Sequence, residues 1–391
     1  MELMTAPKGE RLHIIILGVG NSGKSSVLNA IAGQDISITS NISGTTTDPV
    51  EKAMEIHNLG PVLFIDTAGF DDIGQLGELR VNKTLEAIQR ADIALMVYGK
   101  DDNSGYEEFV HELEKRKIPI INILNKVDEV EYKKLVKELK DPVLFSAGTG
   151  SGKDEVIRRF ISLRKNKQKG YIVGDLVKEN DTVVLVVPQD KEAPEGRIIL
   201  PQVQVMRELI DRKVTFLCTT DDSFKADLYK LKNTPDLVIT DSKVFEKIYK
   251  DIPEGTLLTS FSVLFAAYKG DIEYFLRGAE HIDMLGKNGK ILIAEACSHV
   301  PVEEDIGRVK IPAMLRKKLG KEIAIDVVSG KDFPKNIKEY DLIIHCGSCM
   351  FNKNYVLERV RQAKACSVPM SNYGLVIAKL TGILDKVVIP E

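Results

Sequence analysis

Three cysteines and two histidines in the last third of the chain have the residue types of a metal site. Cys297 and His299 form a Cys-x-His pair, and His345, Cys346 and Cys349 follow as His-Cys-x-x-Cys. Thiolates are soft ligands that hold zinc and iron–sulfur clusters, and imidazole binds many transition metals. The pattern fits a structural zinc site, a cluster with three thiolates, or a metal-free redox Cys-x-x-Cys pair. Spacing alone favours zinc and fits the redox pair least well.

Two apolar runs position these thiols. Residues 291–296, ILIAEA, lead directly into Cys297, and residues 341–345, DLIIH, lead into Cys346. Alternating strand and helix patterns predict a parallel sheet, and parallel strands end at one common edge. We therefore expect the two halves of the motif to meet in one crevice, with Cys366 in a structural role outside it.

A second set of residues has the chemistry of phosphate binding. The run from Gly18 to Ser25 fits G-x-x-x-x-G-K-[ST], directly after the apolar run 12–17 and before a helical pattern. In such a loop the backbone N–H groups face the phosphates, Lys24 neutralises the β and γ groups, and Ser25 offers its hydroxyl to Mg²⁺.

Three further motifs follow in order, each at the end of an apolar strand pattern. In DTAG, Asp66 is expected to hold the water shell of the metal and Gly69 to meet the γ-phosphate. In NKVD, Asn125 and Asp128 are placed to contact a base, and a carboxylate that accepts hydrogen bonds from N1 and N2 of guanine rejects adenine. Ser146–Ala147 can contact the guanine O6. The predicted nucleotide is GTP.

Length and composition limit the other classes of function. The chain has 391 residues, a formal net charge of −3 and a pI near 6.2. The mildly acidic balance argues against a nucleic-acid partner. No apolar run suggests a signal peptide or a membrane span, so we expect no membrane partner, a cytoplasmic protein, and cysteines present as thiols.

The order of patterns predicts an α/β protein with a P-loop nucleotide-binding domain followed by two smaller parallel α/β domains. The expected boundaries are residues 1–168, 169–261 and 262–391. In the middle domain a helix is expected to begin near Pro201, and Cys218 is expected in the core of an apolar strand. Asp190 lies in a charged, proline-rich loop after a strand, where open α/β sheets place ligand contacts.

The four nucleotide motifs, together with SGTTTD at residues 43–48, resemble the GTPases TrmE and Era. The resemblance implies that Thr46, or Thr45, closes over Mg²⁺ and that Asn21 helps to bind K⁺. Ras-like enzymes carry a water-orienting Gln after this DxxG motif, where this chain has Phe70. Slow hydrolysis is therefore expected, and it must rely on K⁺, on a switch carboxylate or on a partner. The resemblance implies potassium stimulation and a catalytic carboxylate at Glu78, with Asp71 and Asp72 as alternatives, beside Lys24 and Thr46.

The nucleotide-site residues implied by the motifs and the resemblance form one set. They are Gly18, Asn21, Ser22, Gly23, Lys24, Ser25, Ser26, Thr45, Thr46, Asp66, Gly69, Asn125, Lys126, Asp128, Ser146 and Ala147.

A TrmE-like GTPase followed by a small α/β domain and this cysteine motif resembles the [FeFe]-hydrogenase maturation GTPases, the HydF family, over essentially the whole chain. The resemblance implies a [4Fe–4S] cluster on Cys297, Cys346 and Cys349 with a labile fourth position, for which His299, His345 and Asp190 are candidates.

That family resemblance also implies a carrier of the diiron precursor of the hydrogenase. The expected partners are apo-[FeFe]-hydrogenase, the radical-SAM hydrogenase maturases and a second copy of the chain, which binds through the middle domain. The alternative is a TrmE- or Era-type GTPase in tRNA modification or ribosome assembly that carries a structural zinc.

Overall fold

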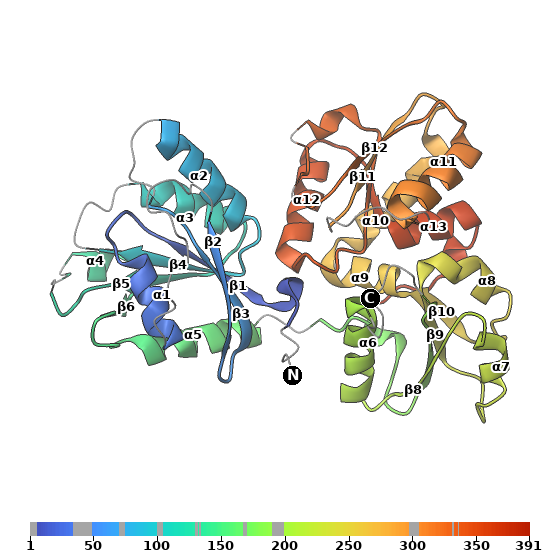
Figure 1. The fold of residues 1–391 in the computed structure, drawn as a ribbon, viewed down its shortest axis with the longest axis horizontal. Coiled ribbons are helices and arrows are strands. Elements are labelled where there is room, and N and C mark those ends of the chain that lie inside the picture. The colour runs from blue at the N-terminus through green and yellow to red at the C-terminus, as the bar shows by residue number, and fades with distance from the viewer. Residues whose placement is uncertain are drawn as a thin grey trace. The chain divides into compact units, whose positions relative to one another are not determined.

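The computed structural model describes residues 6–33, 49–69, 75–99, 105–129, 132, 134–166, 170–189, 199–296, 305–330, 332–334 and 336–391. The chain divides into two compact units, residues 1–169 and 170–391 (Figure 1). Both consist of sheets covered by helices, which confirms the predicted α/β class. Within the described residues, no helix combines the length and apolarity needed to cross a bilayer. The division into three domains stays a prediction.

Several residues singled out by the sequence lie outside the described residues. They are Thr45, Thr46, Phe70, Asp71, Asp72, Asp190, Cys297 and His299.

The first unit holds a six-stranded sheet in the order β2-β3-β1-β4-β5-β6, parallel except for β2. Its strands are β1 (Leu12–Leu17), β2 (Val50–Ile56), β3 (Gly60–Asp66), β4 (Ile93–Tyr98), β5 (Ile120–Leu124) and β6 (Val143–Leu144). β1 and β4 are buried along their whole length, as expected for apolar runs at the centre of a parallel sheet.

Helices cover both faces of this sheet. They are α1 (Lys24–Ala32), α2 (Gln75–Ile88), α3 (Tyr106–Lys115), the short α4 (Leu135–Glu138) and α5 (Lys153–Asn166). α1 and α5 pack on one face, with Leu28 and Phe160 in its core. α2 and α3 pack on the other, with Ile88 and Phe109 buried there. This two-sided cover leaves the carboxyl edge of the parallel strands for the loops that carry the motifs.

The second unit contains two four-stranded parallel sheets, ordered β10-β9-β7-β8 and β12-β11-β13-β14. The strands are β7 (Thr182–Val186), β8 (Thr215–Thr219), β9 (Leu237–Thr240), β10 (Leu257–Ser260), β11 (Lys290–Ala294), β12 (Ala324–Val328), β13 (Leu342–His345) and β14 (Met370–Asn372). The predicted parallel sheets are therefore confirmed. Val184 of the first sheet and Ile291 of the second belong to one hydrophobic cluster, so the sheets share a core.

Eight helices accompany these strands among the described residues. They are α6 (Leu200–Asp211), α7 (Phe224–Leu228), α8 (Phe245–Tyr249), α9 (Phe261–Lys269), α10 (Ile272–Glu280), α11 (Ile311–Leu319), α12 (Lys353–Ala365) and α13 (Tyr373–Thr381). α6 begins one residue before the predicted start, with Pro201 in its first turn, where a missing N–H costs least.

The expectation for Cys218 is wrong. Its side chain is exposed, because β8 is an edge strand and alternate residues of a strand point to opposite faces.

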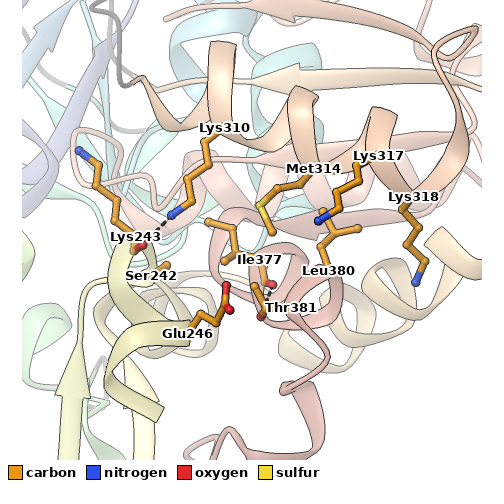
Figure 2. A pocket seen from close by; sticks show the side chains of 10 residues that line it. All are labelled: Ser242, Lys243, Glu246, Lys310, Met314, Lys317, Lys318, Ile377, Leu380 and Thr381. Carbon is orange, nitrogen blue, oxygen red and sulfur yellow. Dashed lines mark hydrogen bonds between the residues drawn. The ribbon is translucent and has the colours of Figure 1, made fainter. Parts of the chain in front are cut away.

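A cavity of about 570 Å³ lies between the segment that follows β9 and helices α11 and α13 (Figure 2). Lysines dominate its lining, and Lys310 donates a hydrogen bond of 2.5 Å to the carbonyl of Lys243. None of the residues singled out by the sequence lines this cavity. Both candidate sites therefore lie elsewhere, at strand ends.

Candidate GTP site and candidate metal centre

The phosphate-binding loop joins the carboxyl end of β1 to the first turn of α1. A Cβ atom at Gly18 would lie 2.5 Å from the carbonyl oxygen of Val97, so the backbone there requires glycine. Gly23 has a φ of +88°, and a Cβ atom on it would lie 2.3 Å from Nδ2 of Asn125. Close approach of neighbouring atoms thus requires glycine at both positions of the motif.

The residues predicted to bind the metal and the phosphates lie close together. Lys24 is buried, and its Nζ donates to the carbonyls of Gly18 at 2.9 Å and Val19 at 2.8 Å. The Ser25 hydroxyl donates to Oδ2 of Asp66 at 3.0 Å. Burial raises the pKa of Asp66, and its Oδ1 is buried with no hydrogen-bond partner among the described residues. The carboxylate of Asp66 and the hydroxyl of Ser25 are oxygen ligands of the kind that Mg²⁺ prefers.

The base-binding motifs are tied to the phosphate loop through one amide. Asn125 is 1% exposed, and its Nδ2 donates to the Ser22 carbonyl at 3.0 Å, while its Oδ1 accepts from Ala147 N–H at 3.3 Å. Asp128 follows in a turn and is exposed. The structure thus gives Asn125 a supporting position and leaves Asp128 accessible to a base.

The remaining nucleotide-site predictions have few contacts. Lys126 donates to the carbonyl of Asn21 at 3.1 Å, and Asn21 has a φ of +57°. Ser26 and Glu78 are exposed, Ser26 on α1 and Glu78 in the first turn of α2. The Ser146 hydroxyl accepts from Thr149 N–H at 3.2 Å. The catalytic role of Glu78 stays a prediction.

Sequence reasoning missed the side chain that supports the phosphate loop. Tyr106, the first residue of α3, donates its hydroxyl to Val97 O at 2.6 Å and accepts from Val19 N–H at 3.2 Å. Its ring stacks on Tyr98 with centroids 4.4 Å apart. The hydrogen bonds of Tyr106 connect the phosphate loop to the end of β4. No sequence motif around Tyr106 indicates this role.

The thiol motif begins where β13 ends, beside the end of β11. The strands pair with Ala294 opposite His345, so their carboxyl ends share one edge as expected. Sγ of Cys346 accepts hydrogen bonds from Ala296 N–H at 3.0 Å and Ser348 N–H at 3.5 Å. Ala296, the last described residue before Cys297, therefore lies within hydrogen-bonding distance of the second half of the motif.

The donors of this edge fit a thiolate-held cluster. N–H groups directed at a ligating sulfur stabilise its negative charge and are a usual feature of iron–sulfur sites. Burial raises the pKa of Cys346 to about 11, and the two N–H groups oppose that rise. A bound metal would instead lower the pKa of Cys346, because a metal favours the deprotonated thiol. Within the described residues, no group of three His, Cys, Asp or Glu side chains forms a metal site, and these residues do not include Cys297.

Both ring nitrogens of His345 already have partners. Nη1 of Arg359 lies 2.8 Å from Nε2, and because arginine only donates, Nε2 accepts and the proton sits on Nδ1. Nδ1 lies 2.9 Å from the Cys346 carbonyl and 2.8 Å from the Ser348 hydroxyl. Burial, and then the nearby guanidinium, lower the pKa of His345 to about 3, so the ring is neutral. As a ligand it would have to give up one of these bonds, and that role stays a prediction.

Further polar residues that the sequence did not indicate surround the thiol loop. Lys269 of α9 is 3% exposed, and its Nζ donates to the carbonyls of Ser348 at 3.0 Å and Phe351 at 2.8 Å. Glu295, just after β11, pairs with Arg308 at 3.1 Å. Buried charged side chains therefore lie both at the loop that carries Cys346 and at the end of β11.

Comparison with known families agrees with this layout. Residues 172–270 match the hydrogen maturase F dimerization domain, residues 273–390 match the hydrogen maturase F tetramerization domain, and residues 13–126 match a 50S ribosome-binding GTPase family.

Curated relatives resemble part of the chain. The tRNA modification GTPase MnmE of Polynucleobacter asymbioticus is 31% identical over 41% of this chain and 37% of its own length. The enzyme of the same name from Chromobacterium violaceum is 38% identical over 30% of this chain and 27% of its own length. The chain thus spans about a third of the length of these relatives, and the similarity bears on GTP binding alone.

Solved structures resemble the chain weakly. The G domain of the T. maritima FeoB iron transporter is 22% identical and covers 40% of this chain and 99% of its own, with a TM-score of 0.30. Era in complex with MgGDPNP and 16S ribosomal RNA is 18% identical and covers 53% of this chain and 92% of its own, with a TM-score of 0.32. The two hydrogen maturase F domains together span more than half of the 391 residues and follow a GTPase domain related to that of MnmE, so the chain belongs to the hydrogen maturase F family.

Proposed function

We propose that this protein is a GTP-hydrolysing scaffold and carrier for hydrogenase maturation. It binds a [4Fe–4S] cluster on Cys297, Cys346 and Cys349, receives the diiron precursor of the active site, and delivers it to apo-[FeFe]-hydrogenase. The observation that supports this most directly is Cys346, whose sulfur accepts two N–H groups at the strand edge that leads into Cys297. Membership of the hydrogen maturase F family adds the maturation role.

Three thiolates leave one iron of such a cluster with a weak or exchangeable ligand, which suits a carrier whose cargo must bind and leave. His299, His345 and Asp190 are the candidates for that fourth position. The diiron unit comes from radical-SAM hydrogenase maturases in the cytoplasm. Two chains pair through the middle domain, in keeping with the dimerization domain matched at residues 172–270.

Anaerobic reconstitution with iron and sulfide tests this function. We expect about four irons and four sulfides per chain, with the visible absorption and the EPR signal of a reduced cluster. The second candidate, a GTPase of the MnmE or Era kind with a structural zinc, is favoured only by the relatives that match the GTPase domain. Stoichiometric zinc with no cluster signal would decide for that candidate and reject the carrier.

The nucleotide unit hydrolyses GTP slowly and with the help of K⁺. Ser25, Thr46 and Asp66 hold Mg²⁺ with its water shell, Lys24 neutralises the phosphates, and Glu78 orients the attacking water. Asn21 contributes to the K⁺ site. Phe70 stands directly after the DxxG motif, where Ras-like enzymes carry the glutamine that orients the attacking water. That glutamine therefore cannot replace K⁺ in this chain.

Replacing K⁺ by Na⁺ at equal ionic strength is expected to lower GTP turnover about tenfold, because a cation at the phosphates stabilises the charge of the transition state. Phosphate release measured in the two salts checks this. Asn21→Gly should abolish the difference without straining the loop, since glycine tolerates the φ of +57° at this position. Fast turnover without K⁺ would rule out the potassium site and leave the GTPase assignment intact.

A further inference from the structure

A buried guanidinium lies beneath the thiol loop. Arg359 of α12 is 1% exposed, which is exceptional for an arginine. Its Nη1 lies 2.8 Å from Nε2 of His345, and its Nη2 donates to the carbonyl of Gly330 at 2.6 Å. Its Nε is buried with no hydrogen-bond partner among the described residues.

Aromatic rings enclose the rest of this side chain. The guanidinium carbon lies 4.6 Å from the ring centroid of Phe351, 4.8 Å from that of Phe333 and 5.2 Å from that of Tyr355. Rings attract a cation with their negative faces, but they supply no full opposite charge. None of the carboxylates in the described part of the chain forms an ion pair with Arg359.

Such a charge needs a partner, because a buried ion without one is costly to the fold. The acidic side chains near Arg359 are the Tyr355 phenol, whose ring lies beside the guanidinium, and the thiol of Cys346, which directly follows the contacted His345. Of these two, the Cys346 thiol becomes an anion when it binds a metal. Within the described part of the chain, the thiolate centre is thus the group that can supply the missing negative charge.

We propose that Arg359 is the built-in counter-charge of the cluster, which raises its reduction potential and, by holding Nε2 of His345, positions the loop that carries Cys346 and Cys349. The inference rests on the proposed cluster. Reduction adds one electron, supplied by an external donor such as dithionite, and a fixed cation nearby favours the more negative, reduced state.

A redox titration of the reconstituted full-length chain, followed by EPR, tests this role. Arg359→Met removes the charge and keeps a long apolar side chain, whereas Arg359→Lys keeps the charge and loses the planar donor set. Arg361→Met is the matched control, because Arg361 lies on the same helix with a 44% exposed side chain and pairs with Glu358 at 3.0 Å.

We expect Arg359→Met to lower the ratio of reduced to oxidised cluster at least about tenfold at a fixed potential, a downward shift of ~59 mV for one electron. Arg359→Lys should recover more than half of that shift, and Arg361→Met should leave the potential unchanged. Two results would overturn the role of Arg359 as counter-charge. One is an unchanged reduction potential in Arg359→Met, and the other is a shift in Arg359→Lys as large as that in Arg359→Met.

Loss of the cluster in a variant is also informative. If Arg359→Met takes up no iron, Arg359→Lys decides alone: a potential close to that of the wild type supports the charge role, and a tenfold fall contradicts it. Failure of both variants to bind iron would make Arg359 a purely structural residue. A wild-type chain that holds zinc and no cluster would remove the proposed function and this inference together, whereas a wild-type cluster with unshifted variants removes the inference alone.

Discussion

Cys346→Ser is expected to abolish the iron–sulfur cluster and to leave GTP hydrolysis within about twofold of the wild type. A cluster held by three thiolates cannot retain its charge balance or geometry on two. The nucleotide residues belong to the first compact unit and this loop to the second, so we expect the two effects to be independent. Iron and sulfide content after reconstitution, and phosphate release by the same preparation, measure the two effects.

The fold should survive this substitution. The Cys346 sulfur accepts N–H bonds from Ala296 and Ser348, and a serine oxygen can accept the same bonds. An unchanged thermal unfolding temperature would show this directly. Equal loss of cluster and of GTP turnover would point to misfolding and would reject the separation of the two sites.

Cys218→Ser is the matched control for thiol chemistry. Cys218 is an exposed cysteine on an edge strand and is not part of the motif. Its replacement should leave iron content unchanged. Full iron content in Cys346→Ser, with loss in Cys218→Ser, would place the cluster elsewhere and contradict the assignment.

Patterns that are local in sequence predicted most of the fold and the outline of both sites. The apolar runs at 12–17 and 341–345 form β1 and β13 within a residue of the expected bounds. Parallel pairing of β11 with β13 follows from the alternation of strands and helices, and it brings the end that leads into Cys297 next to Cys346. Motifs at strand ends are predictable because strand direction alone places them.

Buried polar residues were not predictable in the same way. Arg359 lies in a helix rich in charged residues, and its burial depends in part on Gly330 and Phe333, which come from another part of the chain. Tyr106 and Lys269 likewise act on loops distant in sequence. Cys218 shows the opposite error, since an apolar strand pattern does not reveal which strand lies at the edge. Such contacts depend on tertiary packing, which leaves no periodic signal.

Asp128→Asn is expected to weaken GTP binding by roughly 30- to 1,000-fold, or about 2–4 kcal/mol. The carboxylate is predicted to accept hydrogen bonds from N1–H and the N2 amino group of guanine, and each charge-assisted bond contributes about 1.5–3 kcal/mol. Asp128 is the right position for this test because it is exposed, so its replacement leaves the loop intact. Asn125 would be a poor choice, since its amide ties Ser22 to Ala147 and its loss would disturb the whole site.

Xanthosine triphosphate provides the control for Asp128→Asn. It carries a carbonyl where guanine carries the N2 amino group, so the new amide can donate to it while the native carboxylate is repelled. The variant should therefore bind xanthosine triphosphate more tightly than GTP, and the wild type should show the reverse order in a fluorescence competition assay. If GTP affinity survives in the variant, Asp128 does not read the base and the guanine specificity must come from the backbone near Ala147. If both nucleotides are lost while the thermal unfolding temperature is unchanged, the carboxylate binds the base without selecting it.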